Sequence, residues 1–514
     1  MKTILNTLTI CAFCLVQQAT AQDYDLNKYK YRFQKYRALT GGFGLNSDGD
    51  LSYSKSKDND TIPELSNVNE NNNRGFNYNF DANYWAYKST DAQQMERRFS
   101  LSSRASFGQN GRGNRLDDSL IDSYYGKKSE TSNNLSYNQQ QRFYKPNNSF
   151  NYLAFQGGAQ MSSNNQYTKN TYPGDAKSNS NSYSLNGGMS IGKGNGRIEN
   201  VSDAVSAMFI IKDLQKKGGL PALTDAQTEL IARGITTARN TRFIDFRFRV
   251  IDQIAMLDSF FILAGAKPTN DLIYYTTLYD NWFYATQFYR STGNRFTYYI
   301  NTNGFISQQS YLNEGKIGSH YSESKFTNTQ LYNSLNLDYV STKQIDLYYQ
   351  RSFRLGLQTG LRHATNNQSY KDSMMGSYPY TESKSKDKDQ DAIVAFAYAS
   401  YSHLYQPNTR TYLTWSVTES YGQNNSLIGL RTANLQKIQN TYRNLNTNFN
   451  LSYFRFFSPR LSINAGINAN VYTNLTTNRN EVTYTPTNLF NFKSTNNYIR
   501  GGIGISAGLN YALF

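Results

Sequence analysis

Cysteine is almost absent from this chain. Only Cys11 and Cys14 occur among its 514 residues, and both lie within a stretch that we identify below as a cleaved leader. The rest of the chain can form neither disulfides nor thiolate metal sites. Its stability must therefore come from packing and from backbone hydrogen bonds.

Long apolar runs are missing as well. The best candidate, residues 254–266, contains Asp258 and falls short of the ~20 apolar residues that a membrane-spanning helix needs. Histidine is scarce too, because His320, His363 and His403 are the only three. None has an evident catalytic partner, and no two stand at metal-ligand spacing. We therefore expect no metal, no cofactor and no enzymatic activity.

The N-terminus has the three parts of a secretory signal peptide. Lys2 supplies the positive charge, residues 4–16 supply the apolar stretch, and Ala19-Thr20-Ala21 supplies the cleavage site. The sequence therefore predicts an exported protein whose signal peptide is residues 1–21.

Tyrosine and phenylalanine are abundant in an otherwise polar chain, with 43 Tyr and 30 Phe. The dominant pattern is an alternation of apolar and polar residues with a period of two, which is typical of strands that separate two environments. Residues 461–471 show it clearly. Their odd positions are Leu461, Ile463, Ala465, Ile467, Ala469 and Val471, and their even positions are Ser462, Asn464, Gly466, Asn468 and Asn470.

About fourteen such strands are predicted, many of ten or more residues, whereas strands of soluble sandwiches average about five or six. Short connections alternate with long polar ones, and both termini fall on the side of the short connections. The long polar connections are expected at 57–74, 109–132, 168–181, 367–391, 422–441 and 474–497. This pattern predicts an antiparallel transmembrane β-barrel, with an N-terminal arm at 22–47 and barrel portions at 48–194 and 295–514.

One segment, residues 195–294, changes to helical periodicity. Thr224 and Gln227 form a capping-box pattern at the start of one helix, and several amphipathic helices in a row predict a small bundle. The sequence leaves two placements open, a periplasmic subdomain or a plug inside the barrel. Its charged residues Asp245, Arg247 and Arg249 are candidates for docking a periplasmic partner.

The signal peptide, the alternating strands and the terminal Phe514 together resemble the outer-membrane β-barrel proteins of Gram-negative bacteria. This resemblance implies location in the outer membrane and insertion by the barrel-assembly machinery. The formal net charge of +16 then favours contact with anionic lipopolysaccharide, because an exported chain rarely meets nucleic acid.

Several charged residues fall on the polar positions of their strands and are candidates for lining the lumen. Arginines there would favour anions, or would simply pair with the two aspartates of the same set. The set is Asp81, Arg98, Arg104, Asp338, Arg354, Arg362 and Arg500.

Three functions are compatible with these features. The first is a pore or the membrane component of a transport or export assembly. The second is a non-conducting scaffold whose helical insertion binds a periplasmic partner. The third is a barrel enzyme, which the histidine evidence ranks last. The sequence does not identify a solute.

Overall fold

A computed structural model describes most of residues 24–511. The internal stretches outside the description are 59–64, 117–118, 171–175, 218–219, 241–249, 267–270, 285–288, 316–320, 374–380, 387–389, 432–435, 459–460 and 486–487. The predicted signal peptide, His320 and Phe514 lie outside the described residues.

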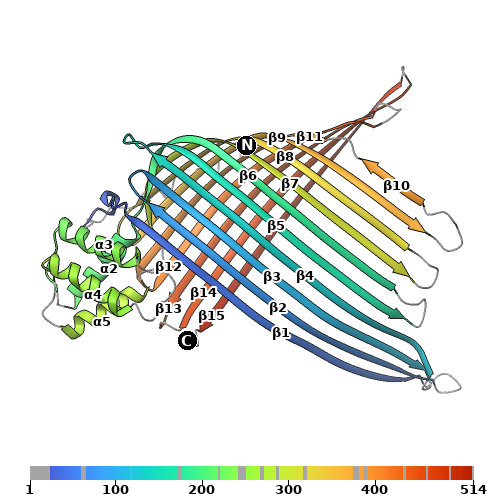
Figure 1. The fold of residues 1–514 in the computed structure, drawn as a ribbon, viewed down its shortest axis with the longest axis horizontal. Coiled ribbons are helices and arrows are strands. Elements are labelled where there is room, and N and C mark those ends of the chain that lie inside the picture. The colour runs from blue at the N-terminus through green and yellow to red at the C-terminus, as the bar shows by residue number, and fades with distance from the viewer. Residues whose placement is uncertain are drawn as a thin grey trace.

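One antiparallel sheet dominates the molecule (Figure 1). Its strands before the helices are β1 (Gln34–Asp58), β2 (Leu65–Ser89), β3 (Gln93–Leu116), β4 (Ser119–Tyr144), β5 (Ser149–Asn170) and β6 (Ala176–Asn200). Those after the helices are β7 (Ser291–Gly315), β8 (Tyr321–Gln344), β9 (Tyr349–Ser373), β10 (Thr381–Lys386), β11 (Gln390–Asn408), β12 (Thr411–Arg431), β13 (Gln436–Phe456), β14 (Leu461–Thr485) and β15 (Asn488–Tyr511).

Chain order is also the order of the strands in space. The path runs from β1 to β9 and from β11 to β15, while the short β10 pairs only with β9. The path contains fourteen of the 15 strands, close to the number predicted. Within the described residues no register joins β1 to β15, so the sheet is an open path and not a closed ring. It curls enough that β12–β15 pass behind β1–β5 in Figure 1.

The strands are much longer than predicted. Apart from β10, they contain between 19 and 26 residues, and a strand of 25 residues is about 80 Å long at ~3.3 Å per residue. The expected long polar connections are therefore wrong over much of their length, because β1 and β2 stay paired out to Asp58 and Leu65. Polar side chains do not prevent this pairing, because the ladder uses only backbone donors and acceptors.

The register sorts side chains onto two faces of the sheet. Ile191, Ile300 and Leu335 lie opposite one another on β6, β7 and β8, and each is at least half exposed. We call the face that carries this row the apolar face. The next row, Ser190, Asn301 and Ser334, lies on the opposite face, which we call the polar face. The predicted alternation is therefore confirmed for these strands.

The predicted N-terminal arm is shorter than expected. β1 begins at Gln34, so only residues 24–33 of the expected 22–47 precede the sheet in the described chain. Gly41, Gly42 and Gly44 interrupt the apolar rhythm of this segment and concealed the strand. A glycine is compatible with a strand but gives no signal of which face it occupies.

The helical segment is also shorter than the predicted 195–294. β6 and β7 stay paired until Asn200 and Ser291 meet. Gly196 and Gly293 have positive φ angles of 85° and 116°, a conformation that glycine adopts without steric cost. These two glycines let the paired strands bend without separating.

Four helices connect β6 to β7. They are α2 (Ser202–Lys216), α3 (Asp225–Asn240), α4 (Val250–Leu263) and α5 (Asp271–Tyr284). None of the helices described is long and apolar enough to cross a membrane. They lie beyond one end of the sheet (Figure 1), so the plug placement is wrong for these helices.

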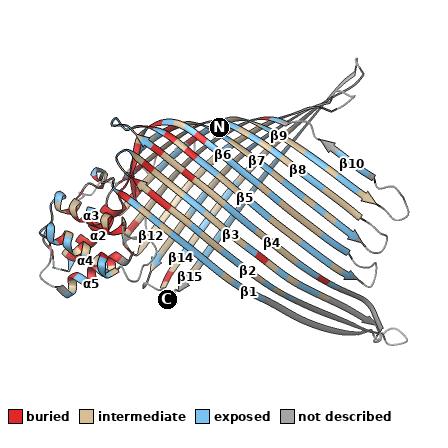
Figure 2. Cartoon of the chain, in the orientation of Figure 1, coloured by how far each residue is buried: buried red, intermediate tan, exposed pale blue. Residues whose placement is uncertain are grey.

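The buried core of the molecule lies in this bundle, as the red residues in Figure 2 show. Almost the whole of α2 is buried, because α3 and α5 pack on it and the N-terminal segment adds Leu26 and Tyr29. Leu347, from the turn between β8 and β9, belongs to the same cluster. The bundle and the end of the sheet therefore share one core.

Two leucine substitutions in the bundle test this placement of the core. Leu214 is fully buried, whereas Leu263 is 71% exposed. We expect Leu214→Ala to lower the free energy of unfolding of the bundle by about 2–5 kcal/mol. The control, Leu263→Ala, should change it by less than about 0.5 kcal/mol. The loss of helical circular dichroism on heating measures both, and equal losses would contradict the assignment.

Candidate functional site

The seven charged residues predicted to line a lumen all lie on the polar face. Residues that oppose each other in a register share a face, and none of the seven opposes a residue of the apolar rows. Asp81 is on β2, Arg98 and Arg104 are on β3, Asp338 is on β8, Arg354 and Arg362 are on β9, and Arg500 is on β15.

The structure brings only two of these residues together. Arg354 Nε donates to Asp338 Oδ1 at 2.8 Å, and the Tyr398 hydroxyl donates to the same oxygen at 2.7 Å. The guanidinium also lies 5.3 Å from the centre of the Tyr398 ring. Asp338 therefore fixes an arginine and a tyrosine from two neighbouring strands.

The other predicted residues are dispersed. Arg98 pairs with Glu96 on its own strand at 2.6 Å, not with either predicted aspartate. Among the residues that the structure describes, Asp81 has no ion-pair partner. Arg104 and Arg500 are exposed.

A groove on the polar face was not anticipated. It has a volume of about 210 Å³ and crosses strands from β4 to β11. Because strands so far apart in the sheet line one groove, the polar face is the concave face here. Its polar lining consists of amide side chains, three tyrosines, a serine and Asp338, and five apolar residues complete it. The polar residues are Asn138, Gln140, Tyr152, Gln156, Ser190, Tyr299, Asn301, Asn336, Asp338, Gln358 and Tyr398, and the apolar ones are Ala154, Phe155, Leu337, Leu357 and Phe396.

Two arginines that the sequence analysis missed lie on the polar face beside this groove. Arg142 stands next to the groove residue Gln140 on β4, and its guanidinium lies 5.3 Å from the Tyr152 ring centre. Arg295 is on β7, four residues before the groove residue Tyr299. The alternation of β7 identifies the face of Arg295, whereas β4 carries glutamines on both faces near Arg142 and gives no such signal.

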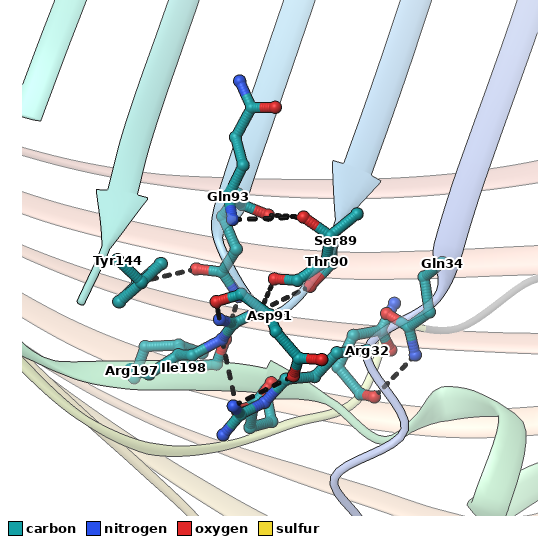
Figure 3. A network of polar contacts seen from close by, with 12 residues as sticks. Arg32, Gln34, Ser89, Thr90, Asp91, Gln93, Tyr144, Arg197 and Ile198 are labelled. Carbon is teal, nitrogen blue, oxygen red and sulfur yellow. Dashed lines mark hydrogen bonds and ion pairs between the residues drawn. The ribbon is translucent and has the colours of Figure 1, made fainter. Parts of the chain in front are cut away.

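The end of the sheet beneath the bundle is held by a second group of polar residues (Figure 3). Arg197, from the bent end of β6, donates to the Thr90 carbonyl at 2.7 Å and to Ser89 Oγ at 2.9 Å. Its guanidinium lies 4.4 Å from the Tyr144 ring centre. β6 thus contacts the turn between β2 and β3, although β4 and β5 separate it from β3 in the sheet.

Arg290 ties the bundle to the opposite part of the sheet. It is 1% exposed and donates to Gln344 Oε1, Gln406 Oε1 and the Leu347 carbonyl. Burial lowers the pKa of its guanidinium to about 10, with Asp346 opposing the shift. All of these acceptors are neutral, so Arg290 is a costly buried charge whose hydrogen bonds must be kept.

A buried carboxylate joins α2, α3 and β1. Asp203 accepts hydrogen bonds from Arg239, from Thr236 Oγ1 at 2.5 Å and from the Tyr36 hydroxyl at 2.6 Å. The Tyr29 hydroxyl lies 3.2 Å from Thr236 Oγ1. Burial, with the charge of Asp203 second, raises the pKa of Tyr29 well above its usual value, so this hydroxyl stays protonated.

The segment before β1 crosses the end of the sheet that the helical bundle covers. We call this end the covered end, and we call the bundle together with this segment the cover. Asn27 Nδ2 donates to the Gln344 carbonyl at 3.1 Å, and Asn27 Oδ1 accepts from Thr292 Oγ1 at 2.6 Å. These contacts lie at the start of β7 and the end of β8, far from β1 in strand order. The arm is therefore part of the cover and not a free tail.

Of the remaining residues singled out from the sequence, the described ones do not form a further site. Asp245, Arg247 and Arg249 lie outside the described residues. His363 Nδ1 is 2.8 Å from Asp391 Oδ1, and His403 packs against Tyr349 and Trp415. Within the described chain, no three His, Cys, Asp or Glu side chains gather as a metal site would require.

Comparison with known proteins adds no family to this picture. No family model matches the sequence, and no curated protein matches it.

The Asp203 network gives a test of how firmly the cover is held. Asp203→Asn leaves the buried Arg239 without a charged partner, and we expect a loss of about 3–5 kcal/mol in the stability of the bundle. The matched control is Glu229→Gln, which breaks the exposed pair of Glu229 with Arg233 on α3 and should cost about 0–1 kcal/mol. Denaturant unfolding, followed by helical circular dichroism, compares them. Similar losses would contradict the structural role of Asp203.

Proposed function

We propose that the chain is a gated outer-membrane pore whose helical bundle closes the periplasmic end. The observation that carries the proposal is the sorting of side chains across the sheet. Exposed apolar rows such as Ile191, Ile300 and Leu335 suit contact with lipid, whereas the amides of the polar face suit an aqueous interior.

Strand length and aromatic placement support a membrane crossing near the helices. A strand of about 80 Å, tilted by about 40°, rises about 60 Å, which is twice the ~30 Å hydrocarbon layer. On the apolar face near the helix end, Tyr349 stacks on Tyr405 and Tyr401 packs on Trp415, as an interfacial girdle does. The far halves of the strands would then extend beyond the membrane, toward lipopolysaccharide.

The same proposal requires β1 and β15 to pair and close the barrel. Followed from strand to strand, the register leads from Tyr36 on β1 to Asn496 on β15. We propose a stagger of about 16 residues between β1 and β15, because over fourteen strands it gives a tilt of about 38°, within the usual range for membrane barrels. This stagger places Leu39 opposite Leu509 and Gly41 opposite Ala507, with each pair on one face.

Cysteine cross-linking tests this closure, because the chain has no cysteine after Cys14. The double variant Gly41→Cys/Ala507→Cys should form a disulfide on oxidation in membranes, because paired strands hold Cα atoms within ~5.5 Å. In the control Leu45→Cys/Ala507→Cys, the first cysteine lies about 13 Å further along β1, beyond disulfide reach. Cross-linking of the control alone, or of neither variant, would contradict the proposed closure.

The bundle is proposed as the gate because its contacts reach round the end of the sheet. Arg290 holds β8 and β11, Asp203 holds β1 through Tyr36, and Thr409 Oγ1 donates to Asn281 Oδ1 of α5 at 3.0 Å. Passage of small hydrophilic solutes would require this cover to move.

Single-channel recording tests the gate. Arg290→Ala removes contacts between the bundle and the strands, and it should raise the frequency of current steps above that of the unmodified chain. The double variant Asn281→Cys/Thr409→Cys should conduct less when oxidised and recover on reduction. Equal currents in the two redox states would show that the bundle does not gate, and silence of every form would contradict a pore.

One observation favours the scaffold as the second candidate. α4 and α5 expose several large apolar side chains in the bundle, a composition suited to a protein contact. These are Ile251, Ile262, Leu263, Leu272, Tyr275 and Tyr279. Their contact with a periplasmic partner would be compatible with a gate that the partner opens.

A further inference from the structure

We infer that the groove on the polar face binds one residue of an acidic saccharide. The inference rests on the proposed function, because it names the class of solute that the interior would recognise. It starts from two features that meet at one place, an excess of positive charge and a lining of hydroxyl-binding groups.

The positive charge beside the groove is not neutralised by the described residues. Arg142, Arg295 and Arg354 lie beside the groove, and Arg142 and Arg354 both repel Arg295. The carboxylate of Asp338 bonds to Arg354, and Glu96, which opposes Gln140, pairs with Arg98. Arg142 and Arg295 therefore have no carboxylate partner among the described residues. Like charges held together in a partly desolvated place favour the binding of an anion.

Buried hydrogen-bond donors without partners also indicate a site for an anion. Arg142 is only 9% exposed, yet its Nε has no hydrogen-bond partner, and its Nη2 has only a 3.3 Å contact with Gln140. Arg295 Nε and the hydroxyl of Thr297, which is 3% exposed, are also buried without partners. Buried donors normally have partners, so a carboxylate or sulfate at this place would complete the set.

The rest of the lining suits a sugar ring. Tyr152, Tyr299 and Tyr398 offer flat apolar faces with polar tips, and the planar amides of the groove can donate to and accept from hydroxyl groups. A volume of about 210 Å³ accommodates one pyranose ring and not a longer rigid chain. A bare inorganic anion would leave these amides and rings unused.

Binding to the full chain in detergent micelles, measured by calorimetry, tests the inference with three probes. Trigalacturonate supplies an acidic sugar, maltotriose supplies a neutral one, and sodium sulfate supplies an anion without a ring. We expect trigalacturonate to bind at least about tenfold more tightly than either of the others, because charged and neutral hydrogen bonds each contribute. Equal binding of maltotriose would overturn the acidic specificity, and equal binding of sulfate would overturn the sugar.

Variants locate the site. Arg142→Gln should weaken trigalacturonate binding about tenfold or more, and Arg142→Lys should weaken it less, since it keeps the charge. Gln358→Ala should weaken it several-fold without changing any charge, which keeps the test valid if Arg142→Gln fails to fold. The control Arg97→Gln removes the same charge from the apolar face, where Arg97 bonds to Gln139, and should leave binding unchanged.

The outcomes separate this inference from the pore. A chain that conducts but binds no trigalacturonate would overturn the saccharide site and leave the proposed function intact. A chain that binds trigalacturonate through Arg142 but never conducts would overturn the proposed pore and leave the saccharide site intact. An unchanged affinity in both Arg142→Gln and Gln358→Ala would place any binding outside this groove and overturn the inference.

Discussion

The backbone ladder between neighbouring strands is the constraint on which the rest of the structure depends. Most pairs of neighbouring strands keep one register over more than twenty residues. In β1 and β2, for example, the register runs from Gln34 opposite Ser89 to Asp58 opposite Leu65. A slip by one residue would exchange the two faces of a strand. It would move Asn301 and Tyr299 out of the groove and place Ile300 in it. The lining of the groove by seven strands is therefore a consequence of registers that hold all along the path.

The covered end follows from the same ladder and from its controlled bending. β6 and β7 remain paired past Gly196 and Gly293, so their ends turn toward β2 and β3 without leaving backbone groups unpaired. This bend brings Arg197 to the Thr90 carbonyl. The buried charges of Arg290 and Asp203 contribute little net stability, because desolvation offsets their bonds. These two buried charges instead fix the position of the bundle on the sheet, because any other position would leave them without partners.

Sequence patterning predicted what depends on local periodicity. It anticipated strands at residues 461–471, the helices, the capping box of Thr224 and Gln227, whose side-chain bonds the structure contains, and the shared face of Arg354 and Asp338. It failed where periodicity carries no information. The glycines of β1 hide which face each residue occupies, and the glutamines on both faces of β4 just before Arg142 hide its parity. Long polar hairpins resemble loops, because backbone pairing does not depend on side-chain polarity. Contacts between distant strands, as in the groove, leave no local trace.

The groove and the cover are parts of one continuous pair of strands. Ser190 and Asn301 line the groove, and ten residues further toward the helices the same two strands end at Asn200 and Ser291, where they meet beneath the bundle. A rigid antiparallel pair transmits displacement along its length, because each paired residue fixes the next. A ligand in the groove shifts the position of the cover only if it binds the two positions with different affinity. The bend at Gly196 lies between the groove and the cover, so a movement of the cover would have to pass through this bend before it could change the contacts in the groove.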